Sequence, residues 1–180
     1  MCSRNGCPKG SVMQSDMKFR GCAAALAALV LIALGSPLYA ATATSTMTVQ
    51  MTITATCLVN SASTLNFGTQ GVLSTNVDQT STIQVTCTNT TPYNVGLDAG
   101  TGTGATVANR KMTSGATTVN YTLYSNAGRT TVWGTTVGTD TVAATGNGAA
   151  QSYTVYGRVP PQAAPAPGTY TDTITVTVTY

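Results

Sequence analysis

The chain has 180 residues, of which 7% are charged, and it contains neither histidine nor glutamate. These absences argue against catalytic triads, most zinc enzymes and the paired carboxylates of glycoside hydrolases, so we expect no catalytic residue, no metal site and no cofactor. The formal charge of +3 arises entirely before residue 41, where four basic residues face one aspartate (4 − 1 = +3), and four basic and four acidic residues cancel in the rest. The basic balance therefore gives no support for a nucleic-acid partner.

The first forty residues predict a targeting segment. A basic stretch at 17–20 precedes an apolar run at 22–34 and a zone of small residues at 35–40. We expect residues 17–40 to be a signal peptide cleaved after Ala40, with Ala43 as the alternative, because the apolar run is too short to span a membrane. Residues 1–16 have no evident role in export, which favours a misplaced start codon or an extension. The mature chain is predicted to be exported and to have no membrane span.

The mature chain opens with a strictly alternating stretch. Threonine or glutamine fills every second place from residue 46 to residue 56, and the places between are apolar or cysteine: Met47, Val49, Met51, Ile53, Ala55 and Cys57. Because side chains alternate between the two faces of a strand, this stretch predicts a ribbon with one apolar face that needs a partner. A long strand directly after a secretion signal is free to pair elsewhere, which suggests strand exchange between subunits. The alternative is that it extends the chain's own first strand.

Two cysteines remain after the targeting segment, Cys57 and Cys87. A single pair in an exported chain predicts one disulfide. Both cysteines lie on the apolar phase of their stretches, so they can face each other inside a sandwich. In the chain-entropy model, closing a loop of about thirty residues stabilises the fold by roughly 3 to 4 kcal/mol.

Short alternating runs recur through the rest of the chain and predict strands. Their apolar members are Leu65 and Phe67; Ile83, Val85 and Cys87; Tyr93, Val95 and Leu97; Val119, Tyr121 and Leu123; and Tyr153 and Val155. Clusters rich in glycine, asparagine, threonine and proline separate them at 100–104, 134–148 and 160–168. This spacing predicts a one-domain, all-β sandwich. The glycines at 100–104 predict a hairpin loop, because the lysine and helix of a phosphate-binding loop are missing.

Three further side chains could carry chemistry, but each has a structural interpretation that we favour. Lys111 and Ser114 could form a dyad, whereas a solvated turn between strands is the stronger interpretation. Trp133 could stack on a sugar, whereas packing in the core or on a sheet face is expected for a tryptophan among strands.

The last residues repeat the alternating scheme of the mature N-terminus. Threonines at 173, 175, 177 and 179 separate a set of apolar side chains that we expect to face inward, namely Ile174, Val176, Val178 and Tyr180. A chain that ends inside a strand has no flanking turn to protect the strand edge.

Several motifs in this order resemble the spore coat protein U domain family. After Cys57 they are Leu65-Asn66-Phe67-Gly68, Ile83-Gln84-Val85-Thr86-Cys87-Thr88, Pro92-Tyr93 with Leu97 and Gly100, Arg110-Lys111-Met112, Tyr121-Thr122-Leu123-Tyr124, Val132-Trp133-Gly134, Tyr156-Gly157-Arg158 and Gly168-Thr169-Tyr170-Thr171-Asp172. The family includes subunits of archaic, Csu-type chaperone–usher pili. The resemblance implies an incomplete immunoglobulin-like β-sandwich, at 56–180, that lacks one strand and is completed by a donor strand from a neighbouring subunit. The stretch at 41–55 resembles that donor extension, with Met47, Val49, Met51 and Ile53 on its inward face.

The resemblance also implies a function and partners. The expected protein is a structural pilus subunit that polymerises by donor-strand exchange and serves adhesion and biofilm formation. Its partners would be identical or related subunits, with a periplasmic chaperone and an outer-membrane usher during assembly. It would pass through the periplasm to the cell surface or the pilus. The main alternative is a secreted coat protein that assembles by surface packing without exchanging strands.

Overall fold

The computed structural model describes residues 39–180. The expected start-codon region and all but the last two residues of the expected signal peptide lie outside the described residues. The chain divides into two units, Met1–Thr48 and Val49–Tyr180. Of the first unit, residues 39–48 are exposed and contain neither helix nor strand. Within 39–180 no helix is long and apolar enough to cross a membrane.

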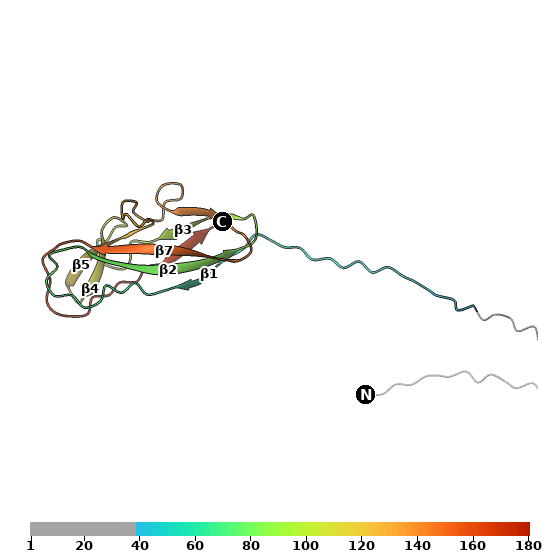
Figure 1. Cartoon of the computed structure of the whole chain (residues 1–180), viewed down its shortest axis with the longest axis horizontal. Coiled ribbons are helices and arrows are strands. Elements are labelled where there is room, and N and C mark those ends of the chain that lie inside the picture. The colour runs from blue at the N-terminus through green and yellow to red at the C-terminus, as the bar shows by residue number, and fades with distance from the viewer. Residues whose placement is uncertain (1–38) are drawn as a thin grey trace, which may run out of the picture. The chain divides into compact units, whose positions relative to one another are not determined.

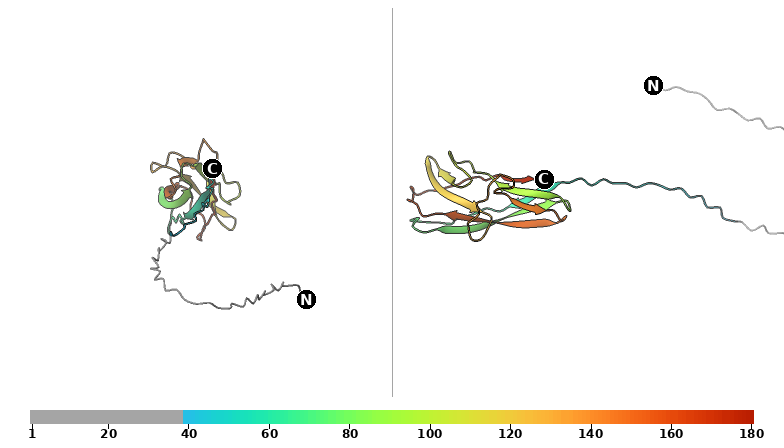
Figure 2. Two further views of the ribbon diagram at one scale, coloured as in Figure 1. Left: turned by 90° about the vertical axis from the view of Figure 1, so that its right-hand side faces the viewer. Right: turned by 90° about the horizontal axis from the view of Figure 1, so that it is seen from above.

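The second unit is built from strands alone over the residues that the structure describes (Figure 1). The strands are β1 (Cys57–Ala62), β2 (Val77–Cys87), β3 (Pro92–Leu97), β4 (Arg110–Ser114), β5 (Thr117–Tyr124), β6 (Val142–Thr145), β7 (Ala150–Val159) and β8 (Val176–Thr179). One sheet has the order β1-β2-β7-β5-β4, the other β6-β3-β8, and every pairing is antiparallel. The turned views show the curled sheets of this all-β unit (Figure 2).

The apolar side chains of the alternating runs form the core between the two sheets. Leu97, Val119, Tyr121, Leu123 and Val155 are among its buried side chains, as are Ile83, Val85, Cys87, Tyr93 and Val95. Trp133 is 1% exposed and its indole Nε1 donates a hydrogen bond to the carbonyl oxygen of Val95 at 2.8 Å. The prediction that this tryptophan packs in the core is confirmed.

Two sequence predictions about local structure are wrong. The run with Leu65 and Phe67 is not a strand, although Phe67 is buried and Leu65 packs against the core. Its side chains pack over Gly157 of β7, where a side chain would take their space. Lys111 and Ser114 lie on strand β4 rather than in a turn, paired with Asn120 and Thr117 of β5.

Two expected loops also differ from the structure. The glycines at 100–104 belong to a connection from β3 to β4, which are in different sheets, so this segment is not a hairpin. The expected loop at 134–148 contains β6, which pairs with β3 through residues such as Val142 and Val95. Its four residues are too few for alternation to stand out in the sequence.

Candidate functional site

The N-terminal extension shows four large apolar side chains to solvent. Met47, Val49, Met51 and Ile53 are 84%, 83%, 81% and 74% exposed. No described residue pairs with them, and the chain's own first strand begins at Cys57. The structure therefore does not use this stretch as part of a complete sandwich. Exposed large apolar side chains that share one face mark a candidate interaction surface.

The second component of the site consists of two free strand edges. Within the described residues, strand β1 is an edge strand of the first sheet and pairs only with β2. Strand β8 is an edge strand of the second sheet and, of the described strands, pairs only with β3. Some Cα atoms of the two strands lie within 8 Å of one another, although no hydrogen-bonded ladder joins them. We call the free edges of β1 and β8, with their inward side chains, the β1–β8 border. Free edges of this kind carry backbone groups that can accept another strand.

Inward side chains at the β1–β8 border are less covered than those elsewhere in the core. Val59 of β1 is cross-strand partner to Val85, so both point to the same face, yet Val59 is 43% exposed and Val85 is fully buried. Val178 of β8 faces the same way as its partner Val95, which is fully buried, but Val178 is only half-buried. The core is thus closed at its centre and incompletely covered at this border.

The predicted inward residues of the last strand lie in different settings. Ile174, Val176 and Val178 are half-buried and pack against the core. Tyr180 follows the last residue of β8 and is 60% exposed. Together with residues 53–55 it lines a shallow hollow at the root of the extension. The structure therefore brings the two alternating stretches of the sequence together only at their ends.

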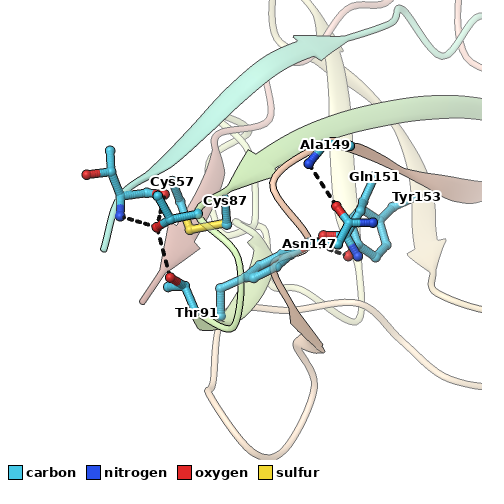
Figure 3. The surroundings of a disulfide bond; sticks show 10 residues. Cys57, Cys87, Thr91, Asn147, Ala149, Gln151 and Tyr153 are labelled. Atoms are coloured by element: carbon cyan, nitrogen blue, oxygen red, sulfur yellow. Dashed lines mark hydrogen bonds between the residues drawn. A yellow bond between two sulfur atoms is a disulfide. The ribbon is translucent and has the colours of Figure 1, made fainter. Parts of the chain in front are cut away.

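A disulfide between Cys57 and Cys87 fixes the root of the extension (Figure 3). It joins the first residue of β1 to the last residue of β2, as the shared apolar phase predicted. Just outside it, the Thr88 amide donates to the Thr56 carbonyl at 2.9 Å, and the Thr56 amide donates to Thr88 Oγ1 at 2.9 Å. Thr88 Oγ1 also bonds the hydroxyl of Thr91 at 2.9 Å. The extension therefore leaves the sandwich from a covalently anchored point.

Arg110 is fully buried, which was not predicted from the sequence. Its guanidinium donates to four carbonyl oxygens, those of Asp98, Val107, Leu97 and Trp133, at 2.7 to 2.9 Å. Burial lowers the pKa of this guanidinium, against the opposing effect of Tyr121 and the nearby aspartates. An arginine on the apolar phase of a strand normally indicates a strand end or an exposed face. No pattern in the sequence distinguishes this one.

Two of the aspartates near Arg110, Asp98 and Asp172, act as structural acceptors. Asp98 Oδ1 accepts from the amides of Gly100 and Thr175. Burial alone would raise the pKa of Asp98, but these hydrogen bonds together with the positive charge of Arg110 lower it. Asp172 accepts from the amide and hydroxyl of Thr101 and from the Tyr121 hydroxyl at 2.7 to 2.9 Å. Within the described part of the chain, no three cysteine, aspartate or glutamate side chains are grouped as metal ligands would be. The hydrogen bonds of these aspartates tie loops to strands.

Comparisons with known proteins agree with this geometry. The chain is 34% identical to Protein U of Myxococcus xanthus over an alignment of 173 residues that covers 88% of this chain and 96% of the relative. Its fold is similar to a chain in the crystal structure of the CsuC–CsuE chaperone–tip adhesion subunit pre-assembly complex from the archaic chaperone–usher Csu pili of Acinetobacter baumannii. That similarity has a TM-score of 0.53 and 28% identity, and it covers 72% of this chain. This chain spans 40% of the length of that solved chain.

The family model of the Spore Coat Protein U domain matches residues 43–177, which include most of the exposed extension and all of the sandwich except its last residues. The chain therefore belongs to the Spore Coat Protein U domain family.

Proposed function

We propose that this protein is an exported structural subunit of a chaperone–usher-type fibre, polymerised by donor-strand exchange. The observation that carries the proposal is the coexistence of two complementary features in one chain. One is the exposed alternating extension with Met47, Val49, Met51 and Ile53, and the other is the incompletely covered β1–β8 border. In a fibre, the extension of one subunit adds a strand at the β1–β8 border of the next.

The energetics favour such an exchange. Burying four large apolar side chains contributes about 1.5 to 3 kcal/mol each, so roughly 6 to 12 kcal/mol before the cost of ordering the extension. The inserted strand also covers the exposed part of Val59 and the half-buried side chains of β8. Backbone hydrogen bonds to a free edge give affinity, and the alternate side chains fix the register.

The same border accounts for the proposed assembly partners. A subunit with an uncovered apolar border aggregates unless something occupies it, so a periplasmic chaperone holds it until exchange at an outer-membrane usher. The fold similarity to a solved chaperone–subunit pre-assembly complex supports this assignment. The fibre then lies at the cell surface, where it serves adhesion and biofilm formation.

Charge substitutions on the two faces of the extension test the proposal. We expect Met51→Lys to abolish polymer formation, because an unpaired charge among apolar side chains costs several kcal/mol. The neighbouring Gln50→Lys is the matched control, since it places the same charge on the opposite face and should polymerise normally. Polymer length is measured by electron microscopy, and circular dichroism checks that both subunits fold. Equal polymer yields from the two variants would exclude strand exchange through this segment.

A second experiment separates the donor from the acceptor. A variant lacking residues 41–55 keeps the sandwich and its border and loses the extension. We expect it to fold, to bind a chaperone or an added donor peptide, and to form no polymer. Polymers formed without residues 41–55 would contradict the proposal.

A coat protein that assembles by surface packing is the second candidate. It is favoured by the similarity to Protein U, which extends over 96% of that relative. This candidate predicts that the Met51→Lys and Gln50→Lys subunits assemble alike, and that the variant lacking 41–55 still assembles.

A further inference from the structure

Two of the four apolar side chains on the extension contain an oxidisable sulfur. Met47 and Met51 are 84% and 81% exposed, while Val49 and Ile53 on the same face have no group that mild oxidants attack. Beyond residue 40 the sequence has one other methionine, Met112, which is half-buried against the core. The thioethers most open to solvent thus lie on the face proposed to enter a neighbouring subunit.

We propose that Met47 and Met51 are oxidation sites through which hydrogen peroxide blocks assembly of free subunits while assembled subunits are spared. The inference rests on the proposed donor-strand function and adds a chemical regulation to it. The oxidant belongs to the peroxide class, which converts methionine to methionine sulfoxide.

The chemistry is a two-electron oxygen transfer. A lone pair of the thioether sulfur attacks one peroxide oxygen, so that an S–O bond forms as the O–O bond breaks. The departing hydroxide takes the proton of the transferred hydroxyl and leaves as water. Sulfur is oxidised by two electrons, the peroxide is reduced, and the products are one sulfoxide and one water per methionine.

Methionine sulfoxide packs less favourably than methionine against the β1–β8 border. A sulfoxide oxygen is a strong hydrogen-bond acceptor, and burying it without a donor is unfavourable. The inward side chains of the β1–β8 border, such as Val59, Val176 and Val178, are aliphatic and offer no donor. Oxidation before exchange therefore weakens insertion. After exchange, the same sulfurs lie against the apolar border and peroxide reaches them slowly.

The test uses purified full-length mature subunits treated with hydrogen peroxide, followed by removal of the peroxide with catalase. Peptide mass spectrometry reports the sulfoxide content of each methionine, and electron microscopy reports polymer yield. The double variant Met47→Leu with Met51→Leu keeps the apolar face without sulfur, and Met112→Leu is the matched control. Pre-formed polymer is treated in parallel.

We expect oxidation of wild-type subunits at Met47 and Met51 to reduce polymer yield about tenfold or more. The double variant should assemble equally with and without peroxide, whereas Met112→Leu should respond like the wild type. Methionine sulfoxide reductases acting on both epimers should restore assembly of oxidised wild-type subunits. In pre-formed polymer, both residues should oxidise at least about tenfold more slowly than in free subunits.

Three results would overturn the inference. One is normal polymerisation of wild-type subunits that are fully oxidised at both positions. Another is an equal loss of assembly by the oxidised double variant, and the third is a failure of the reductases to restore assembly. Val49→Asp separates this failure from that of the proposed function. If Val49→Asp blocks assembly and oxidation does not, strand exchange is supported and the oxidation inference is wrong. If Val49→Asp assembles normally, the proposed strand exchange is wrong.

Discussion

Arg110 carries a permanent positive charge at a fully buried position of the core. Such a charge is tolerated where its donors are satisfied, and here the guanidinium bonds carbonyl oxygens of Leu97, Asp98, Val107 and Trp133. These carbonyls come from the end of β3, the following connection and the segment after β5. One side chain therefore holds together backbone segments that make no sheet with one another.

Removing that guanidinium should be costly. We expect Arg110→Met to lower the free energy of unfolding by about 3 to 5 kcal/mol, because several buried carbonyls lose their donors together. Lys111→Met is the neighbouring control, since Lys111 Nζ makes one exposed hydrogen bond to the Thr103 carbonyl, and its effect should stay within about 0.5 kcal/mol. Urea denaturation measures both, and similar midpoints for the two variants would contradict the role assigned to Arg110.

Asp78 and Arg158 form a two-point ion pair between β2 and β7. Arg158 donates from Nε and Nη2 to the two carboxylate oxygens at 2.7 and 2.8 Å, and this lowers the pKa of Asp78 below its ordinary value of 3.8. A carboxyl group with a lowered folded-state pKa stabilises the fold above its ordinary pKa, and this contribution is lost as pH falls through the lowered value.

We therefore expect Asp78→Asn to flatten the pH dependence of the free energy of unfolding below about pH 4. The effect should be small and should shrink with added salt, because the pair is partly exposed. Urea midpoints measured at several pH values and two ionic strengths provide the test. Arg158→Gln should flatten the same window, and a profile identical to the wild type in either variant would refute the assignment.

Among the elements, β7 depends on one glycine for its packing. A Cβ on Gly157 would lie 2.7 and 2.9 Å from the two Cδ atoms of Leu65 and 3.0 Å from Cζ of Phe67. The segment between β1 and β2 can thus lie directly on this strand. We expect Gly157→Ala to destabilise the fold by about 1 to 3 kcal/mol through overpacking. Gly71→Ala, where a Cβ meets nothing within 4 Å, is the control, and thermal unfolding measures both.

The sequence predicts the long strands well because their alternation is regular and one face is buried. The run from Ile83 to Cys87 predicts the end of β2, and the run from Val119 to Leu123 predicts β5. The run with Leu65 and Phe67 has the same alternation but no strand, because close packing on Gly157 replaces a ladder. Alternation in the sequence indicates which side chains are buried, but it does not indicate which backbone groups form hydrogen bonds with another strand.

At the scale of the whole molecule, the extension and the last strand could be recognised as apolar ribbons from the sequence. The sheet orders could not, because they depend on connections that cross between sheets. The same holds for the β1–β8 border, where Val59 is exposed and no described strand pairs with the outer edge of β1. Arg110 was not predicted as a core residue, because its burial depends on carbonyls from three separate places in the chain, namely Leu97 with Asp98, Val107 and Trp133.

A donor peptide should stabilise the sandwich in proportion to its binding. For the variant lacking residues 41–55, we expect a peptide of residues 46–55 at a hundred times its Kd to raise the free energy of unfolding by about 2.7 kcal/mol. A peptide with Val49→Asp should have no effect at the same concentration. Thermal unfolding across a peptide titration measures the shift. A peptide-independent midpoint would show that the β1–β8 border does not accept this strand.

In the proposed fibre, the disulfide between Cys57 and Cys87 would have a mechanical consequence under tension. Pulling on the extension loads the chain at Thr56, one residue before β1, which is an edge strand of six residues. Without a cross-link the pull would peel β1 from its neighbour one hydrogen bond at a time. The covalent bond instead transmits the force directly to β2, so β1 bears little of the load. Strand β2 has 11 residues and is paired with β1 on one side and β7 on the other. Reduced fibres should therefore extend and break at lower force than oxidised ones in optical-tweezers measurements.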